Sequence, residues 1–508
     1  MSQVTDHSAE LMKYLMLKLY KTVTGSDQNI QLARNKFITW LMPGIPFAPN
    51  DFNFCHKGLV GDEKNSTQDL YHQAFVLSKL FDFIPDIPNL GSEGNQFQDT
   101  ENFLQTTYTT SQDTLSSVWN DVLKYSRVIN NEISEKEKKK LKKFRNLLSV
   151  TKEITDIVTD EKKKVTEPGP LTIAYTAKMN EYIEAADEYM NMLIDAQAGG
   201  NDPESRRKVS AWANKSKFMR LKVEAAWGAW NSQGYKNEYE HINAYIEQVT
   251  QKSMVLYKQD LQEKFKNALL SSPAEGTAGD FYYTTLIPGN FATSPGWTKF
   301  SFGEGDIATS YSKETKEWGG KGGISIGSFS LGGKASGSKT KELTKNKTTN
   351  FKASLEFVQI PILRAWFDPG FFSMRAWTLD KLWDLNFEGK KVSDGEIQPQ
   401  GRLVAYPVIA LFVRNVSFTF DDAEEEIKAL KEKIGGGGSL GWGPLKIGGR
   451  YEKGKETKDV HSHTENGEVK IDGLQLIGFI NNLIPKAPNP NPDISPEQFV
   501  GGEQTSSE

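Results

Sequence analysis

Two short clusters carry residue types that bind metals or act as nucleophiles. His461 and His463 stand two positions apart, with Glu465 after them, so on a strand the two imidazoles would point the same way. No third firm ligand is visible, and a polar loop accounts for the cluster. Cys55 and His56 are adjacent, and neighbouring side chains rarely face each other as a nucleophile and its base must. We therefore predict neither a metal site nor a Cys–His catalytic pair.

Other recurring catalytic patterns, such as H-E-x-x-H, a phosphate-binding loop and C-x-x-C, are absent from the sequence. The glycine clusters of the chain are not followed by the striped helix that a dinucleotide-binding loop needs. Acidic residues at 421–426 precede Ile427, Leu430 and Ile434, so they suit the first turn of a short helix better than a calcium site. We expect a non-enzymatic protein that binds no cofactor and no metal.

One strongly basic segment has the composition of a surface for anionic partners. Its lysines alternate with the apolar residues Leu141, Phe144 and Leu148 on a predicted helix. Such a helix can contact lipid head groups or an acidic protein face, and a solvated helix face is the alternative. Glutamates dilute the run and the chain has a net charge of −4, so we expect no nucleic-acid binding. The basic surface consists of Lys138, Lys139, Lys140, Lys142 and Lys143.

The most informative pattern in the sequence is a segment that occurs twice. Residues 318–333 read WGGKGGISIGSFSLGG, and residues 434–449 read IGGGGSLGWGPLKIGG, which is an offset of 116 positions. The same offset continues outward without a gap, so that the two copies cover about 297–365 and 413–481. Repetition at one spacing over this length predicts an internal duplication.

Within each copy the apolar residues alternate and then change phase at a glycine. A two-residue hairpin turn explains the change, because a glycine at its first central position accepts φ > 0. A β-bulge at that glycine is the competing explanation. In the second copy the turn would set Trp442 opposite Leu445 and Leu440 opposite Ile447. The two apolar faces are Ile324, Ile326, Phe329 and Leu331, and Leu440, Trp442, Leu445 and Ile447; the turns and joints are Gly327, Gly332, Gly333, Gly443, Pro444, Gly448 and Gly449.

The hairpin faces either pack into the core of a β-domain or move and contact another surface. The arms are shorter than the ~9–11 residues of a membrane-spanning strand, so a moving hairpin would lie in the bilayer interface with Trp442 as its anchor. We expect a membrane-active protein of the pore-forming or toxin type that is a homo-oligomer in its active state. The alternative is a structural or self-assembling protein in which the faces contact identical subunits.

The elements that position these hairpins indicate an α+β fold. Helical spacing near 11–19, 37–41 and 70–81 predicts a compact helical domain over residues 1–110. Apolar stripes then predict a bundle or stalk over residues 111–275, with helices at 114–165, 171–198, 204–231 and 236–270. Residues 280–484 read as a β-rich domain that contains both copies, including buried strands around Pro407. Residues 485–508 are predicted to be a disordered Pro-rich tail.

The composition limits the number of hydrophobic cores and indicates the compartment in which the chain is made. A chain of 508 residues with 37% hydrophobic content can build two to four cores. Its single cysteine excludes an internal disulfide and favours synthesis in a reducing compartment. The N-terminus has no secretory signal pattern, and no apolar run reaches the ~18 residues of a spanning helix. We expect a soluble protein that is made in the cytoplasm without a signal peptide and released by lysis or by a dedicated secretion machine.

Overall fold

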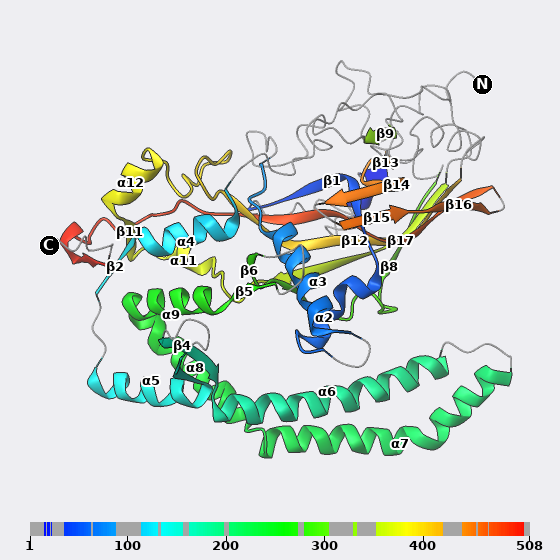
Figure 1. Ribbon diagram of the computed structural model, residues 1–508, viewed down its shortest axis with the longest axis horizontal. Helices are drawn as coiled ribbons and strands as arrows, with labels where there is room; N and C mark the ends of the chain where they lie inside the picture. The colour runs from blue at the N-terminus through cyan, green and yellow to red at the C-terminus, as the bar shows by residue number, and fades with distance from the viewer. Residues whose placement is uncertain are drawn as a thin grey trace. The chain divides into compact units, whose positions relative to one another are not determined.

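The computed structural model combines helices with antiparallel sheets, which confirms the α+β class (Figure 1). It describes residues 15–16, 18–20, 22, 35–61, 65–87, 113–130, 134–155, 162–197, 203–272, 279–303, 329–332, 352–419, 439–453, 456–465 and 467–501. One compact unit comprises residues 1–127, 261–494 and 502–508, and the other comprises residues 128–260 and 495–501. This division differs from the predicted boundaries, since residues 1–127 share a unit with most of the β-rich region.

The first unit is built on a large antiparallel sheet. Its path runs through β1 (Lys36–Phe47), β17 (Glu468–Leu483), β12 (Ala405–Thr419), β10 (Lys352–Leu363) and β7 (Thr285–Leu286), while β8 (Thr298–Phe302) pairs with β10 and β16 (Ser462–Glu465) pairs with β17. The predicted helix over residues 37–41 is wrong, because these residues lie in β1. The register of β1 against β17 shifts between Trp40 and Ile45. The apolar residues have a helix-like spacing because both faces of β1 are covered: Ile38 and Trp40 join one hydrophobic cluster, and Leu41 joins another.

The strand β12 is apolar on both sides because both faces of the sheet are covered. Leu411 and Val413 join one hydrophobic cluster, whereas Ala410 and Phe412 join another. Alternate residues of a strand point to opposite faces, so a continuous apolar run is the pattern of a strand buried on both sides. The buried strand predicted around Pro407 is therefore confirmed.

Helix α3 (Thr67–Phe81) covers one face of the sheet and matches the helix predicted over 70–81. It begins at Ser66, whose hydroxyl accepts the N–H of Asp69 at 3.1 Å. Leu70, Ala74 and Leu77 are buried, and they pack in the cluster that contains Phe412 and Phe479. The short helices η2 (Pro49–Phe52) and α2 (Asn53–Lys57) extend this layer.

The opposite face carries a small second sheet in the order β15 (Glu456–Val460), β14 (Leu445–Lys453), β13 (Ser439–Trp442) and β9 (Phe329–Gly332). Residues around Leu15 and Leu19, within the predicted first helix, are helical and join the same cluster. The duplicated segment therefore contributes strands to the layer that covers this face (Figure 1).

A third group of short elements in the first unit surrounds helix α4 (Leu115–Tyr125). These elements are α11 (Gly370–Ser373), β11 (Trp377–Leu379) and α12 (Lys381–Phe387). Strands β5 (Leu269–Ser271) and β6 (Asp280–Tyr282) pair with each other and join the cluster that contains α3. Trp119 of α4 is fully buried, and its indole N–H donates to the carbonyl of Trp366 at 2.8 Å. Its ring contacts Phe367, Phe371 and Phe372 edge-on.

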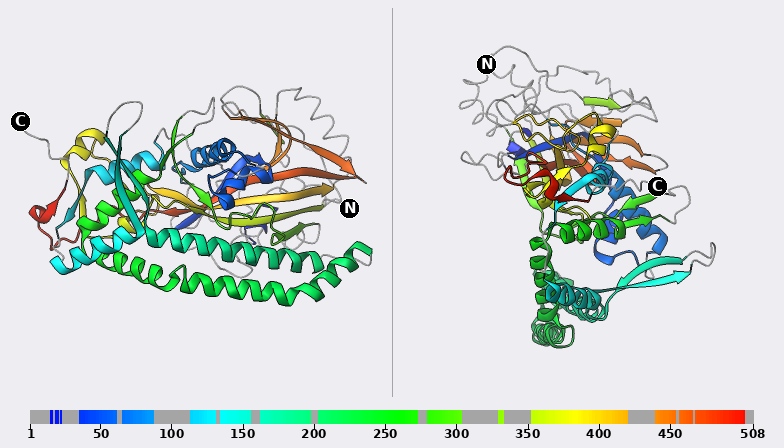
Figure 2. Two further views of the ribbon diagram at one scale, coloured as in Figure 1. Left: turned by 60° about the horizontal axis from the view of Figure 1, so that its bottom comes forward. Right: turned by 90° about the vertical axis from the view of Figure 1, so that its left-hand side faces the viewer.

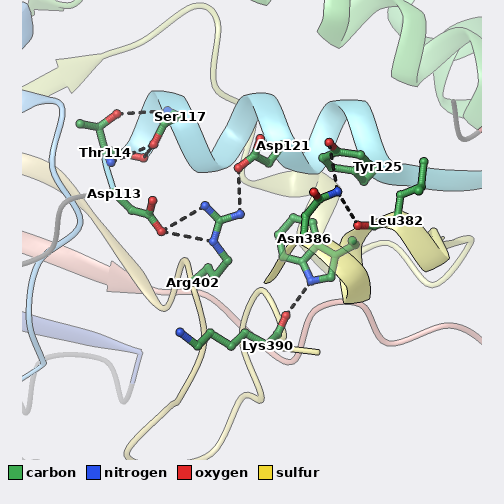
Figure 3. A network of polar contacts seen from close by, with 10 residues as sticks. Asp113, Thr114, Ser117, Asp121, Tyr125, Leu382, Asn386, Lys390 and Arg402 are labelled. Carbon is green, nitrogen blue, oxygen red and sulfur yellow. Dashed lines mark hydrogen bonds and ion pairs between the residues drawn. The ribbon is translucent and has the colours of Figure 1, made fainter. Parts of the chain in front are cut away.

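Arg402 fastens α4 to the segment that contains α12, as Figure 3 shows. Its guanidinium lies 3.1 Å from Asp113 Oδ2 and 2.8 Å from Asp121 Oδ2. The same group stacks over the ring of Phe387, with its Cζ 3.6 Å from the ring centroid. Only 9% of the Arg402 side chain is exposed, so both ion pairs are shielded from solvent on the arginine side. Nothing in the local sequence around Arg402 indicated this contact.

The second unit is mainly helical, but its first predicted helix is wrong. The span 114–165 contains α4, β2 (Ser126–Ile129), α5 (Glu135–Leu148), β3 (Ser149–Thr155) and part of β4 (Lys162–Pro168). The stripe is interrupted because Ser134 caps α5 and because the β-branched run after Leu148 forms a strand that pairs with β4. The capping box at Ser134, where Glu137 bonds back to the cap, marks a helix start inside the predicted helix.

The later helical predictions agree more closely with the structure. The helices α6 (Pro170–Gln197) and α7 (Pro203–Ser232) match the predicted spans closely and lie side by side (Figure 2). Their contact includes the ring pairs Tyr182–Trp230 and Tyr189–Trp212. The last predicted helix is divided into α8 (Lys236–Lys252) and α9 (Met254–Asn267) at Ser253, whose hydroxyl accepts the N–H of Leu256.

The C-terminal segment is more ordered than predicted. Ala487 is buried and pairs with Ser393. Further on, η4 (Pro496–Gln498) leads into β18 (Phe499–Val500), which pairs with β2. The prediction of a disordered tail from residue 485 is therefore wrong as far as residue 501, because its apolar residues are used in packing. Among the described residues, no helix is both long and apolar enough to cross a membrane.

Candidate functional site

The second of the two similar segments forms the predicted hairpin. Strands β13 and β14 are joined at Gly443 and Pro444, and Gly443 has the predicted positive φ, at 55°. Trp442 lies opposite Leu445 and Gly441 lies opposite Lys446, as expected. A bulge then shifts the register, so that Leu440 pairs with Gly448 instead of Ile447. The turn explains the phase change at the glycine, and the bulge lies farther from the turn.

The apolar face of this hairpin is packed against the large sheet. Leu440 and Ile447 have no exposed surface, and 2% of Leu445 is exposed. They share one hydrophobic cluster with Ile38 and Trp40 of β1 and with Ile477 of β17. The two sheets are connected by packing, since β13 and β14 pair within the small sheet. This arrangement fits the core alternative for the hairpin as folded; the side chain of Trp442 is outside the described set.

A buried glutamine clamps the hairpin to the large sheet. Gln475 of β17 is 1% exposed, and its carboxamide accepts the N–H of Lys446 at 2.8 Å. The same carboxamide donates to the carbonyl of Lys446, also at 2.8 Å. The main-chain N–H and carbonyl of Lys446 are thus both hydrogen-bonded to a side chain of the large sheet. The neighbouring residues in the sequence gave no signal for this contact, because Lys446 and Gln475 are far apart along the chain.

The turn of the hairpin is held at the irregular part of β1. The N–H of Gly44 donates to the carbonyl of Pro444 at 2.8 Å. A Cβ at residue 44 would lie 2.6 Å from this carbonyl oxygen and 2.8 Å from that of Leu476, so the close approach requires glycine. The turn Gly443–Pro444 therefore docks where the register of β1 shifts, between Trp40 and Ile45. Gly448 and Gly449, predicted as joints, lie within β14.

The first copy is visible only in part. Phe329, Leu331 and Gly332 lie in β9, which pairs with β13, and nothing is described of the first two side chains. The predicted residues Ile324, Ile326, Gly327 and Gly333 lie outside the described residues, as does the acidic helix expected after residue 421. Residues 323–327 read G-I-S-I-G, which formally matches the G-x-S-x-G pattern of a nucleophile elbow. That elbow leads into a helix, whereas strand β9 follows here.

Strand pairing repeats at the same offset as the sequence. In the first copy Phe302 pairs with Ala353 and Phe300 pairs with Leu355. Adding 116 to each number gives the pairs Phe418–Val469 and Val416–Ile471, both of which occur between β12 and β17. Gln475 likewise corresponds to Gln359 of β10. Equivalent residues thus pair alike at this end of the strands, whereas Thr298–Phe357 has no counterpart, because Arg414 pairs with Leu474.

The predicted basic surface is a continuous exposed face of α5. All five predicted lysines are exposed, and Leu141 on the other side of the helix is buried with Val249. The glutamates that seemed to dilute the charge are engaged locally. Glu135 pairs with Lys138 at 2.7 Å, and Glu137 bonds to the Ser134 cap. Lys140 lies over the ring of Tyr245, with its Nζ 4.0 Å from the ring centroid.

The candidate catalytic and metal clusters have little chemical capacity in this structure. Burial raises the pKa of the Cys55 thiol to about 11, so the thiol is protonated and weakly nucleophilic at neutral pH. His463 is exposed, and its Nδ1 lies 3.5 Å from Asp472 Oδ2. Within the described part of the chain, no group of three or more potential ligands could hold a metal ion.

Comparisons with protein-family models, with curated proteins and with solved structures found no match to this chain. The docked hairpin and the basic face of α5 are therefore the two features from which a function can be argued.

Proposed function

We propose that this protein is a non-enzymatic, membrane-active protein of the pore-forming type, in which hairpin β13–β14 leaves the large sheet and enters a lipid interface. The docked state of this amphipathic hairpin is the observation that carries the proposal. Its apolar face is covered by a sheet with which it does not pair, so the hairpin can lift together with its neighbours β9 and β15, with the ladders of the small sheet intact. A backbone that keeps its internal hydrogen bonds is the form that lipid tolerates.

The energies of such a move are compatible with a triggered change. Burial of Leu440, Leu445 and Ile447 contributes roughly 5–9 kcal/mol, at about 1.5–3 kcal/mol for each side chain. An apolar bilayer interior would return most of this energy, whereas water would not. The remaining cost is the loss of the Gln475 clamp and the Gly44–Pro444 bond, at about 1 kcal/mol for each net hydrogen bond. The hairpin would therefore stay docked in water and be released at a membrane.

The basic face of α5 supports the choice of an anionic membrane. Lysines near an anionic surface contribute about 1 kcal/mol each. Since the glutamates of α5 are engaged with Lys138 and Ser134, the outer lysines present a nearly uncompensated positive face. We propose that this face binds anionic head groups. We further propose that the two copies arose by duplication, on the support of the strand pairs that they share.

Vesicle flotation and dye release test the membrane proposal. The purified protein should float with vesicles that contain phosphatidylserine and release their dye, and it should do so much less with pure phosphatidylcholine. Changing Lys139, Lys142 and Lys143 to glutamine should weaken binding about 100-fold, since three lysines together contribute about 3 kcal/mol.

The matched control changes three exposed lysines of α7, Lys215, Lys217 and Lys222, to glutamine, and it should bind as the unaltered protein does. The proposal fails if the unaltered protein neither binds nor permeabilises anionic vesicles at any pH between 4 and 8.

A further inference from the structure

Strand β13 has a partner on each edge. Its own hairpin partner β14 lies on one side, where Gly441 pairs with Lys446 and Trp442 pairs with Leu445. Strand β9 of the other copy lies on the second side, where Gly441 pairs with Ser330 and Trp442 pairs with Phe329.

The two partners of β13 are repeat-equivalent. Adding 116 to Phe329 and Ser330 gives Leu445 and Lys446, so β9 meets β13 in the register of the hairpin partner. Leu331 also pairs with Leu440. The equivalent of Leu331 in the second copy is Ile447, which does not pair with Leu440 because the bulge shifts the register. The second edge of β13 thus accepts a strand of the first copy in the residue register of the hairpin, through the main-chain groups that point away from β14.

This recognition does not require that β9 and β13 belong to one molecule. The chain reaches β9 from β8 through residues 303–328 and continues to β10 through residues 333–351. Exchange of one identical element between copies is a low-cost route to association. The contacts made after exchange are those made before it.

We propose that β9 is exchangeable between copies of this protein, and that β9 of one copy pairs with β13 of the next. The donor strand and the acceptor strand are different parts of the chain, so each copy gives one strand and receives one. Such a heterologous contact builds a ring where the rotation closes and a filament where it does not. The inference concerns assembly, and it does not depend on the membrane proposal.

Disulfide trapping between two singly altered chains tests the exchange. In a C55S background, which removes the only cysteine, one chain carries Ser330→Cys and the other carries Gly441→Cys. After mixing at high concentration and mild oxidation, we expect at least tenfold more linked dimer than either chain forms alone. A second opposed pair, Gly332→Cys with Ser439→Cys, should give the same result.

The control mixes Ser330→Cys with Ser439→Cys, which lie two positions out of register and should not link efficiently. The chain carrying both Ser330→Cys and Gly441→Cys shows whether the strand pair forms. If the double variant forms its internal disulfide but the mixed single variants form no disulfide-linked dimer at any concentration, the exchange is overturned. It is also overturned if neither disulfide forms. Because vesicle release is measured separately, failure of either proposal leaves the other to be judged by its own assay.

Discussion

Replacing Gln475 with alanine is expected to destabilise the docked hairpin by about 2–4 kcal/mol and to speed dye release from anionic vesicles at least about tenfold. The change removes both hydrogen bonds of the clamp, and it leaves the N–H and the carbonyl of Lys446 buried without that partner. Each factor of ten in rate corresponds to about 1.4 kcal/mol, so even part of this destabilisation is measurable.

Asn481→Ala provides a matched control on the same strand. Asn481 is as buried as Gln475, but its amide donates to Thr39 Oγ1 at 3.1 Å, and its other acceptors also lie in β1 and β17. We expect this variant to lose stability without faster dye release. If both variants unfold more easily and neither releases dye faster, the clamp is a core contact only, and the hairpin is not the mobile part.

Replacing Arg402 with alanine should lower the free energy of unfolding of the first unit by about 2–3 kcal/mol, less than for a fully buried pair because solvent reaches Asp113 and Asp121. The loss has a definite origin: Asp113 and Asp121 would face each other without the guanidinium that lies between them, and Phe387 would lose its stacked partner. Urea denaturation followed by the fluorescence of the buried tryptophans measures the change. Arg402→Lys keeps the charge but not the two-pronged geometry, so it should recover only part of the loss.

The Arg402 variant also separates stability from membrane contact. The arginine joins α4 to the α12 segment through Asp113, Asp121 and the ring of Trp383. At temperatures where the variant stays folded, we expect its flotation with anionic vesicles to be unchanged. A loss below about 1 kcal/mol would mean that the ion pairs are dispensable, contrary to this account.

The sequence allowed predictions where neighbouring residues decide the structure. The turn at Gly443 followed from one glycine and the phase of the residues on either side of it. Helices α3, α6 and α7 followed from long apolar stripes with clear ends. The buried strand β12 followed from a continuous apolar run that only a sheet covered on both faces explains.

The predictions failed where distant contacts decide the structure. Phe37, Trp40 and Leu41 have helical spacing, but they lie in a strand whose two faces are both covered by elements far away in the sequence. The long helix over 114–165 ignored the Ser134 cap and the β-branched residues after Leu148. The Gln475 clamp and the Arg402 ion pairs join residues that no local pattern relates, so the sequence carried no sign of them.

Hydrogen–deuterium exchange of residues 439–453 in the unaltered protein, with and without anionic vesicles, tests the central claim most directly. In water we expect slow exchange in this segment, because its strands are paired and its apolar face is covered. With vesicles that contain phosphatidylserine, we expect the exchange of this segment to change while that of β12 stays the same. If the protein binds the vesicles but residues 439–453 exchange at the same rate with and without them, the account is contradicted, because the hairpin would then have stayed on the sheet.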